Sequence, residues 1–169
     1  MLVAEQPFAS GCELLVSIAS AGQIVDACPP PYHILIERAL RDEGTSYHYL
    51  PPSPHAVADA GLVALASDAF SRADCAFRTG TTWTTDAPFR ETAAMVEARR
   101  AEGILAVEME AASLYAFAEA SGNPVLCLAH VTNQLGCVEN DFEKGEADGA
   151  ACSLDLVRRV SAAWRARSA

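Results

Sequence analysis

Short apolar runs alternate along the chain with longer stretches whose apolar residues recur at helical spacing. The runs that predict buried strands are 13–18, 75–80, 104–107 and 125–131. The stretches that predict helices are 54–70, 92–102, 109–120 and the segment from Gly145 onward. Residues 34–40 fit either a strand or one short helix. This alternation is typical of an α/β fold, and we expect three layers, with a mostly parallel mixed sheet flanked by helices.

Length and composition are those of one globular domain spanning residues 1–169. A chain of 169 residues can bury a sizeable core. Hydrophobic residues make up 51% of the chain and charged residues 20%, which excludes a disordered protein. The sequence has no internal repeat and no linker long enough to divide it.

The chain is acidic, with a formal net charge of −10. It has no basic stripe that could neutralise phosphates, so we expect no nucleic-acid partner. No run reaches about 18 uninterrupted apolar residues, so no membrane span is expected. Glu5 and Gln6 interrupt the start of the chain, which argues against a signal peptide. A cytoplasmic location follows as an expectation.

Six cysteines could indicate disulfides or a metal site. They are Cys12, Cys28, Cys75, Cys127, Cys137 and Cys152. Their spacing is wide and irregular, with no Cys-x-x-Cys pair and no histidine at ligand spacing. We therefore expect reduced thiols in the core and no bound metal.

Small or polar residues follow four of the predicted strands. These residues are Ser20, Trp83 with Asp86, Glu108 with Glu110, and Thr132 with Asn133. Open α/β sheets bind ligands in the crevice beyond the carboxyl ends of their strands. If the four strands are parallel neighbours, these groups converge on one crevice.

The segment 103–118 places two carboxylates directly after a strand and before an Ala/Leu-rich helix. In an extended chain Glu108 and Glu110 point to the same side, with Met109 opposite. Two acceptor-only side chains suit a polyhydroxylated ligand such as a sugar. Acidic residues also commonly open helices, and from the pattern alone both interpretations stay open.

Residues 104–115, Ile-Leu-Ala-Val-Glu-Met-Glu-Ala-Ala-Ser-Leu-Tyr, resemble the Glu-Met-Glu signature of the nucleoside phosphorylase superfamily, the purine nucleoside and uridine phosphorylase type. Three more segments agree in order and spacing. Residues 18–22 resemble the family's turn that binds phosphate and ribose. Residues 80–86 resemble the segment whose aromatic stacks on the base, and residues 131–133 fall where the family contacts the base. The likeness covers about residues 13 to 165 and implies a phosphorylase-like fold.

The resemblance implies a ribose-binding group made of Glu108, Met109 and Glu110. Glu110 would hold the 2′- and 3′-hydroxyls, and its charge would stabilise the oxocarbenium character that develops as the glycosidic bond breaks. Met109 would pack against the sugar, and Glu108 would help to shape the site. Ser20 and the backbone around Gly22 would bind phosphate.

The resemblance also implies base-binding residues. Trp83 would offer a flat face to the base, and Asn133 would hydrogen-bond the base edge and relieve the charge of the leaving group. Arg90 would reach the base or the mouth of the site. Asn133, Glu110 and Arg90 are thus the implied catalytic residues. Each has an ordinary alternative: Trp83 a buried core aromatic, Asn133 a turn residue, Arg90 a surface ion-pair partner.

The sequence departs from the family pattern in the half of the site that binds phosphate. From the resemblance we expect the domain to lack roughly the family's N-terminal third, which carries a glycine-bearing phosphate loop and a phosphate-binding arginine. Ser17 stands where phosphorolytic members often carry another arginine, and Ala19 replaces a glycine. Asn133 in place of aspartate fits a 6-oxopurine or pyrimidine better than adenosine.

The expected reaction is phosphorolysis, in which a purine or pyrimidine nucleoside and phosphate give free base and ribose 1-phosphate. Phosphate is then a co-substrate, and no cofactor is expected. Two alternatives remain: an N-glycosidase that uses water, and a relative without catalysis that binds nucleosides or forms oligomers. The resemblance also implies a homo-oligomer.

Overall fold

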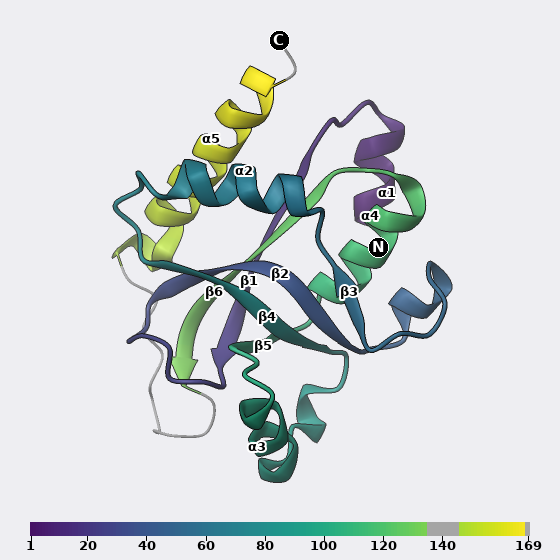
Figure 1. The fold of residues 1–169 in the computed structure, drawn as a ribbon, viewed down its shortest axis with the longest axis vertical. Coiled ribbons are helices and arrows are strands. Elements are labelled where there is room, and N and C mark those ends of the chain that lie inside the picture. Colours follow the sequence, from purple (N-terminus) through teal and green to yellow (C-terminus); the bar gives the residue numbers. More distant parts are fainter. Residues whose placement is uncertain (135–145, 168–169) are drawn as a thin grey trace.

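The computed structural model describes residues 1–134 and 146–167, which fold around one sheet (Figure 1). The strands are β1 (Leu15–Gln23), β2 (Tyr32–Asp42), β3 (His55–Val57), β4 (Phe77–Thr85), β5 (Ala106–Glu108) and β6 (Val125–Gln134). The helices are α1 (Leu2–Ala9), α2 (Ala60–Phe70), α3 (Ala93–Ala101), α4 (Ala111–Ser121) and α5 (Ala150–Arg167). Short 3-10 turns are η1 (Thr45–His48), η2 (Pro88–Arg90) and η3 (Glu146–Gly149). None of the helices described here is long and apolar enough to cross a membrane.

The sheet closes on itself like a barrel, which corrects the expectation of three layers. Its strand order is β3-β2-β4-β5-β1-β6, and β2 also pairs with β6. This closure is possible because β2 is long: residues 32–35 pair with β6 on one edge while residues 33–42 pair with β4 on the other. The pairs β1–β6, β2–β4 and β4–β5 are parallel, and β1–β5, β2–β3 and β2–β6 are antiparallel. The sheet is therefore evenly mixed rather than mostly parallel.

Alternation along the strands supplies two cores on opposite faces of the sheet. In β6, Cys127 and Ala129 belong to the cluster that includes Tyr115 of α4. The intervening Leu126 and Leu128 belong to a second cluster with residues of α2 and α5. A strand with both faces buried reads as a continuous apolar run, which is why β6 is recognisable in the sequence.

Several predicted boundaries shift. Residues 54–70 form a short strand and then a helix, because the Asp59 side chain caps α2 by accepting a hydrogen bond from Leu62 N at 2.7 Å. Residues 18–22, which resemble a turn of the family, lie inside β1, and residues 81–85, which follow the predicted strand 75–80, lie inside β4. Threonines are β-branched and fit a buried pleated strand, so the polar run 81–85 is compatible with β4. Residues 34–40 are strand, and helix α1 was not expected.

A disulfide joins Cys75 to Cys152, which corrects the expectation that all six cysteines are reduced. Their Cα atoms are 5.9 Å apart although 77 residues separate them in sequence, so their spacing alone gave no sign of the pairing. Cys12, Cys28 and Cys127 are free thiols, and only Cys127 is buried. Cys137 lies outside the described residues.

We expect the Cys75→Ser variant to lose roughly 2–4 kcal/mol of unfolding free energy, because the cross-link removes the entropy of a long loop from the unfolded chain. Urea unfolding of the oxidised protein measures this loss, with Cys12→Ser as the matched control. Equal unfolding midpoints for wild type and Cys75→Ser would contradict the expectation.

Candidate functional site

A cavity of about 240 Å³ lies beside η2, between the last residues of β5 and residues near the carboxyl ends of the parallel strands β1 and β6; β5 runs antiparallel to β1. Its lining residues are Ser20, Ala21, Gly22, Pro88, Glu91, Val107, Glu108, Met109, Thr132 and Asn133. Three of the four predicted strand ends thus converge on one space. Six of the residues singled out in the sequence line it, whereas Trp83, Asp86, Arg90 and Glu110 do not.

The β1 and β6 side of the cavity contains a β-bulge. The two strands run parallel with Ala21 opposite Val131, but the next pair is Gly22 opposite Asn133. Thr132 is therefore an extra residue on β6, and such bulges bend a strand and re-aim the side chains beside it. The bulge sets the half-buried Asn133 and the exposed Ser20 at the rim of the same cavity.

Glu108 is only 4% exposed, and both of its carboxylate oxygens are hydrogen-bonded within the protein. Oε1 accepts from Thr82 Oγ1 at 3.1 Å and from Thr84 Oγ1. Oε2 accepts from the backbone N–H groups of Glu110 at 2.8 Å and Ala111 at 2.7 Å. Burial raises the pKa of Glu108, and these four hydrogen bonds oppose that rise. Glu108 thus joins β4, β5 and the start of α4.

Glu110 lies in a different environment from Glu108, contrary to the expectation that the two share one side. The strand ends at Glu108, and Glu110 is the exposed residue at the N-terminal cap of α4. Alternation holds only in an extended chain, and here the chain turns into the helix between the two acids. Glu110 Oε2 accepts a hydrogen bond from Met109 N at 3.2 Å. Met109 itself is 48% exposed and lines the cavity.

Trp83 is completely buried on the other face of β4. It packs with Ile24, Ile104 and Val107, and its Nε1 donates a hydrogen bond to Asp42 Oδ2 at 2.9 Å. This is the core position that the sequence left open as an alternative. Base stacking by Trp83 stays a prediction, and in this geometry the ring offers no exposed face.

A family profile of the phosphorylase superfamily matches residues 2–162. The chain belongs to the phosphorylase superfamily. Comparison with individual curated proteins gave no match. Membership supports a nucleoside phosphorylase-like function in general terms.

The segment 86–91 supplies two lining residues that the sequence did not single out, Pro88 and Glu91. Asp86 is turned elsewhere: its Oδ2 accepts a hydrogen bond from Gly44 N at 3.0 Å. Arg90 is exposed at the end of η2 and does not line the cavity. Glu91, next to it, is half-buried in the cavity wall, and burial raises the pKa of its carboxyl. In the sequence Glu91 is simply one of the polar residues that precede α3, and no other signal marks it.

The cavity is acidic. Glu91 and Glu108 are the ionisable residues that line it, and none of its described lining residues is Arg, Lys or His. Within residues 1–134 and 146–167 no group of His, Cys, Asp and Glu is placed to hold a metal ion. The arrangement suits a neutral polyhydroxylated ligand better than a dianion.

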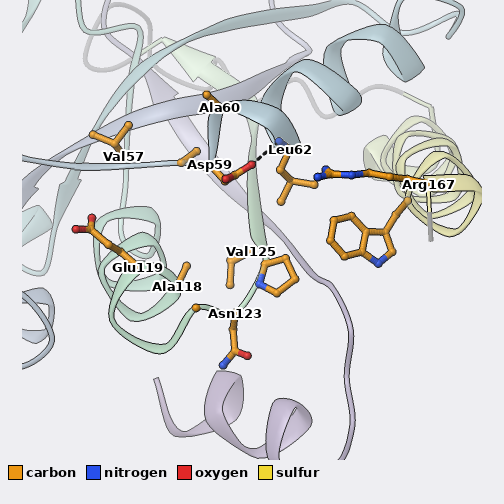
Figure 2. Close-up of a pocket in the computed structure, with 13 residues that line it drawn as sticks. Val57, Asp59, Ala60, Leu62, Ala118, Glu119, Asn123, Val125 and Arg167 are labelled. Atoms are coloured by element: carbon orange, nitrogen blue, oxygen red, sulfur yellow. Dashed lines mark hydrogen bonds between the residues drawn. The ribbon is translucent and has the colours of Figure 1, made fainter.

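A larger cavity of about 640 Å³ lies elsewhere, between the start of α2 and the ends of α4 and α5 (Figure 2). Asp59 on its wall is already used as the cap of α2, and Figure 2 shows that contact with Leu62 as a dashed line. Asn123 and Glu119 also line this cavity. None of the residues predicted from the sequence to bind substrate lies here, so we assign the site to the smaller cavity.

We expect Glu108→Gln to lower the free energy of unfolding by about 1–3 kcal/mol. A glutamine amide has one acceptor oxygen, so its NH₂ group faces donors that the carboxylate now satisfies. Urea unfolding measures the change, and Glu110→Gln at the exposed cap position is the matched control, with an expected change within about 0.5 kcal/mol. Equal losses in the two variants would show that the buried network is not what stabilises this segment.

Proposed function

We propose that the protein cleaves the N-glycosidic bond of a nucleoside, with phosphate as the acceptor of the ribosyl group. The products are free base and ribose 1-phosphate. The observation that carries this proposal is the cavity itself, where Ser20 and Gly22, Met109 and Asn133 meet. Each comes from a segment that resembles a ligand-binding segment of nucleoside phosphorylases, and the chain belongs to the same superfamily.

The sugar is assigned to the side of the cavity near Met109 and Glu110. Met109 lines the cavity and is exposed enough to pack against a ribose face. Glu110 follows it directly, and its exposed carboxylate would accept hydrogen bonds from the 2′- and 3′-hydroxyls. As the glycosidic bond breaks, positive charge develops on the ribose, and a nearby carboxylate stabilises it. Glu108 holds the segment that carries Met109 and Glu110 in place, because its carboxylate accepts hydrogen bonds from backbone N–H groups at the start of α4.

The base is assigned to Asn133 at the end of β6. Its amide can both donate and accept, which fits the edge of a 6-oxopurine or pyrimidine. A hydrogen bond from the amide N–H would spread the negative charge that the departing base acquires. Arg90 would approach the base only from the mouth of the cavity. The Ser20 hydroxyl and the backbone at Gly22, which is paired with Asn133 across β1 and β6, would bind the phosphate on the same side of the cavity.

We expect Asn133→Ala to lower kcat/KM for base release by about 10²–10³-fold, the loss typical of removing one hydrogen-bond donor that stabilises developing charge. Chromatography of free base from inosine, uridine and adenosine, with and without phosphate, measures this loss. Asn123→Ala, in the larger cavity, is the matched control and should keep wild-type activity. Nucleoside binding without base release under either condition would contradict catalysis and support a binding protein.

A second candidate is hydrolysis, in which water replaces phosphate. It is favoured by the acidic lining, because a phosphate dianion needs cationic donors to offset its desolvation. Glu91 would then act as the general base. The water oxygen bonds to C1′ and gives a proton to Glu91, the C1′–N bond breaks, and its electron pair leaves with the base, which takes up a proton from solvent.

If hydrolysis operates, we expect Glu91→Gln to reduce phosphate-independent base release by about 10²–10⁴-fold. In the wild type the rate should rise with pH through a midpoint above the ordinary glutamate value, because the base must be ionised and burial raises its pKa. The exposed Glu119→Gln is the matched control and should keep this profile. Base release that requires phosphate and does not change in Glu91→Gln would contradict hydrolysis while leaving phosphorolysis in place.

A further inference from the structure

A second group of reactive side chains lies at the seam where β2 pairs with β6, on the α5 side of the sheet. The Cys75–Cys152 disulfide joins the loop before β4 to the first turn of α5. His33 of β2 lies beside it, with Nδ1 3.6 Å from Cys152 Sγ and Nε2 2.9 Å from Ser153 Oγ. The His130 ring stacks on His33, with ring centroids 4.7 Å apart.

The disulfide can be reached from solvent. Cys75 and Cys152 are each half-buried, and both line an open cavity of about 430 Å³ together with His33, His130 and Arg159. A cavity of this size is in the range that accommodates drug-sized molecules. Exchange requires a thiolate to approach a disulfide sulfur, so accessible disulfides are the ones that react.

We propose that Cys75–Cys152 is a reversible thiol–disulfide exchange site for low-molecular-weight thiols, and that His33 assists the reaction at Cys152. The attacking thiolate forms a bond to Cys75 Sγ, and the Cys75–Cys152 bond breaks. The electron pair stays on Cys152, which takes up a proton. A second thiolate attacks the small-molecule sulfur of the mixed disulfide and releases Cys75, also protonated. Two thiols are oxidised to one small disulfide as the protein disulfide is reduced, and the reverse reaction uses that disulfide as oxidant.

The geometry explains why Cys152 is the leaving sulfur. In the tautomer with a proton on Nδ1, His33 donates a hydrogen bond to Cys152 Sγ and accepts one from the Ser153 hydroxyl at Nε2. A hydrogen bond to the departing thiolate lowers the barrier to its release. Burial and the neighbouring His130 lower the pKa of His33 to about 4, so the ring is neutral at pH 7 and the two hydrogen bonds fix its tautomer.

Exchange would change how α5 is held against the barrel. Gly149 lies so close to His130 that a Cβ there would stand 2.1 Å from His130 Cε1, so the start of α5 is packed directly on β6. The disulfide links this first turn of α5 covalently to the loop before β4. After reduction the hydrogen bond of Ser153 and the packing of Leu156 and Val160 would remain.

The test is the rate at which reduced glutathione opens the disulfide in the native protein, followed by mass spectrometry of the peptide that links Cys75 to Cys152. We expect reduction in folded protein, recovery with oxidised glutathione, and faster hydrogen exchange of residues 149–153 in the reduced form. We expect the rate constant to fall about tenfold in His33→Gln, as for loss of a hydrogen bond to a charged group. His55→Gln is the matched control and should react like wild type.

Ser153→Ala provides a second variant that leaves the strand intact, and its rate should also fall. Circular dichroism of each variant establishes that it is folded before the rates are compared. Reduction only after unfolding in urea would overturn the exchange site. Wild-type rates in both His33→Gln and Ser153→Ala would overturn the role of His33.

Discussion

The buried carboxylate of Glu108 is the interaction on which the candidate site depends. It accepts hydrogen bonds from two threonine side chains of β4 and from two backbone N–H groups at the start of α4. Thr84 Oγ1 in turn accepts from Ala112 N at 3.0 Å, so the helix is held to β4 by two routes. A buried network of this kind is stabilising only when every member is satisfied. Replacing any one member leaves a donor or acceptor unpaired.

This network divides the Glu-Met-Glu segment into a structural and a solvent-facing part. Both carboxylate oxygens of Glu108 accept hydrogen bonds from groups inside the protein. Met109 and Glu110, in the turn that Glu108 holds, are exposed to solvent. Met109 and Glu110 form a two-residue bend that joins the end of β5 to the start of α4. The bend is short and the Glu110 backbone N–H is held by Glu108, which suits residues proposed to hold a sugar in one orientation.

The sequence was sufficient for the parts of the fold that rest on local periodicity. α3 follows from the charged helical segment 92–102, α4 from its Ala/Leu-rich segment and β6 from its apolar run, and Gly122 ends α4 in the left-handed conformation with φ 69°. Closure of the sheet could not be predicted, because it depends on β2 pairing with β4 and β6 at once, which no local pattern encodes. The Cys75–Cys152 disulfide could not be predicted either, because it joins residues far apart in the sequence and no local pattern encodes their contact.

Three of the four predicted strand ends contribute residues to the cavity, but not every side chain singled out at those ends lines it. Ser20, Met109 and Asn133 meet as expected. Trp83 does not, since adjacent residues of β4 alternate between faces and its ring falls on the side of α3 while Thr82 and Thr84 reach Glu108. Glu91 was missed because its position depends on how the turn η2 folds over the cavity. Sequence spacing gives the order of such residues but not the face on which each one lies.

β6 connects the candidate site with the proposed disulfide-exchange site. Its residue His130 lies at the barrel seam beside His33, and its residue Asn133 lines the candidate site three positions later. Between them the strand is paired with β1 on one edge and with β2 on the other up to Val131, so it cannot shift locally without breaking sheet hydrogen bonds. Beyond Val131 the β2 pairing ends and the bulge begins, and Thr132 and Asn133 are held by β1 alone. The end of β6 that we propose to contact the base is therefore paired along one edge only, and Gly149, at the start of α5, packs against His130 three positions before Asn133.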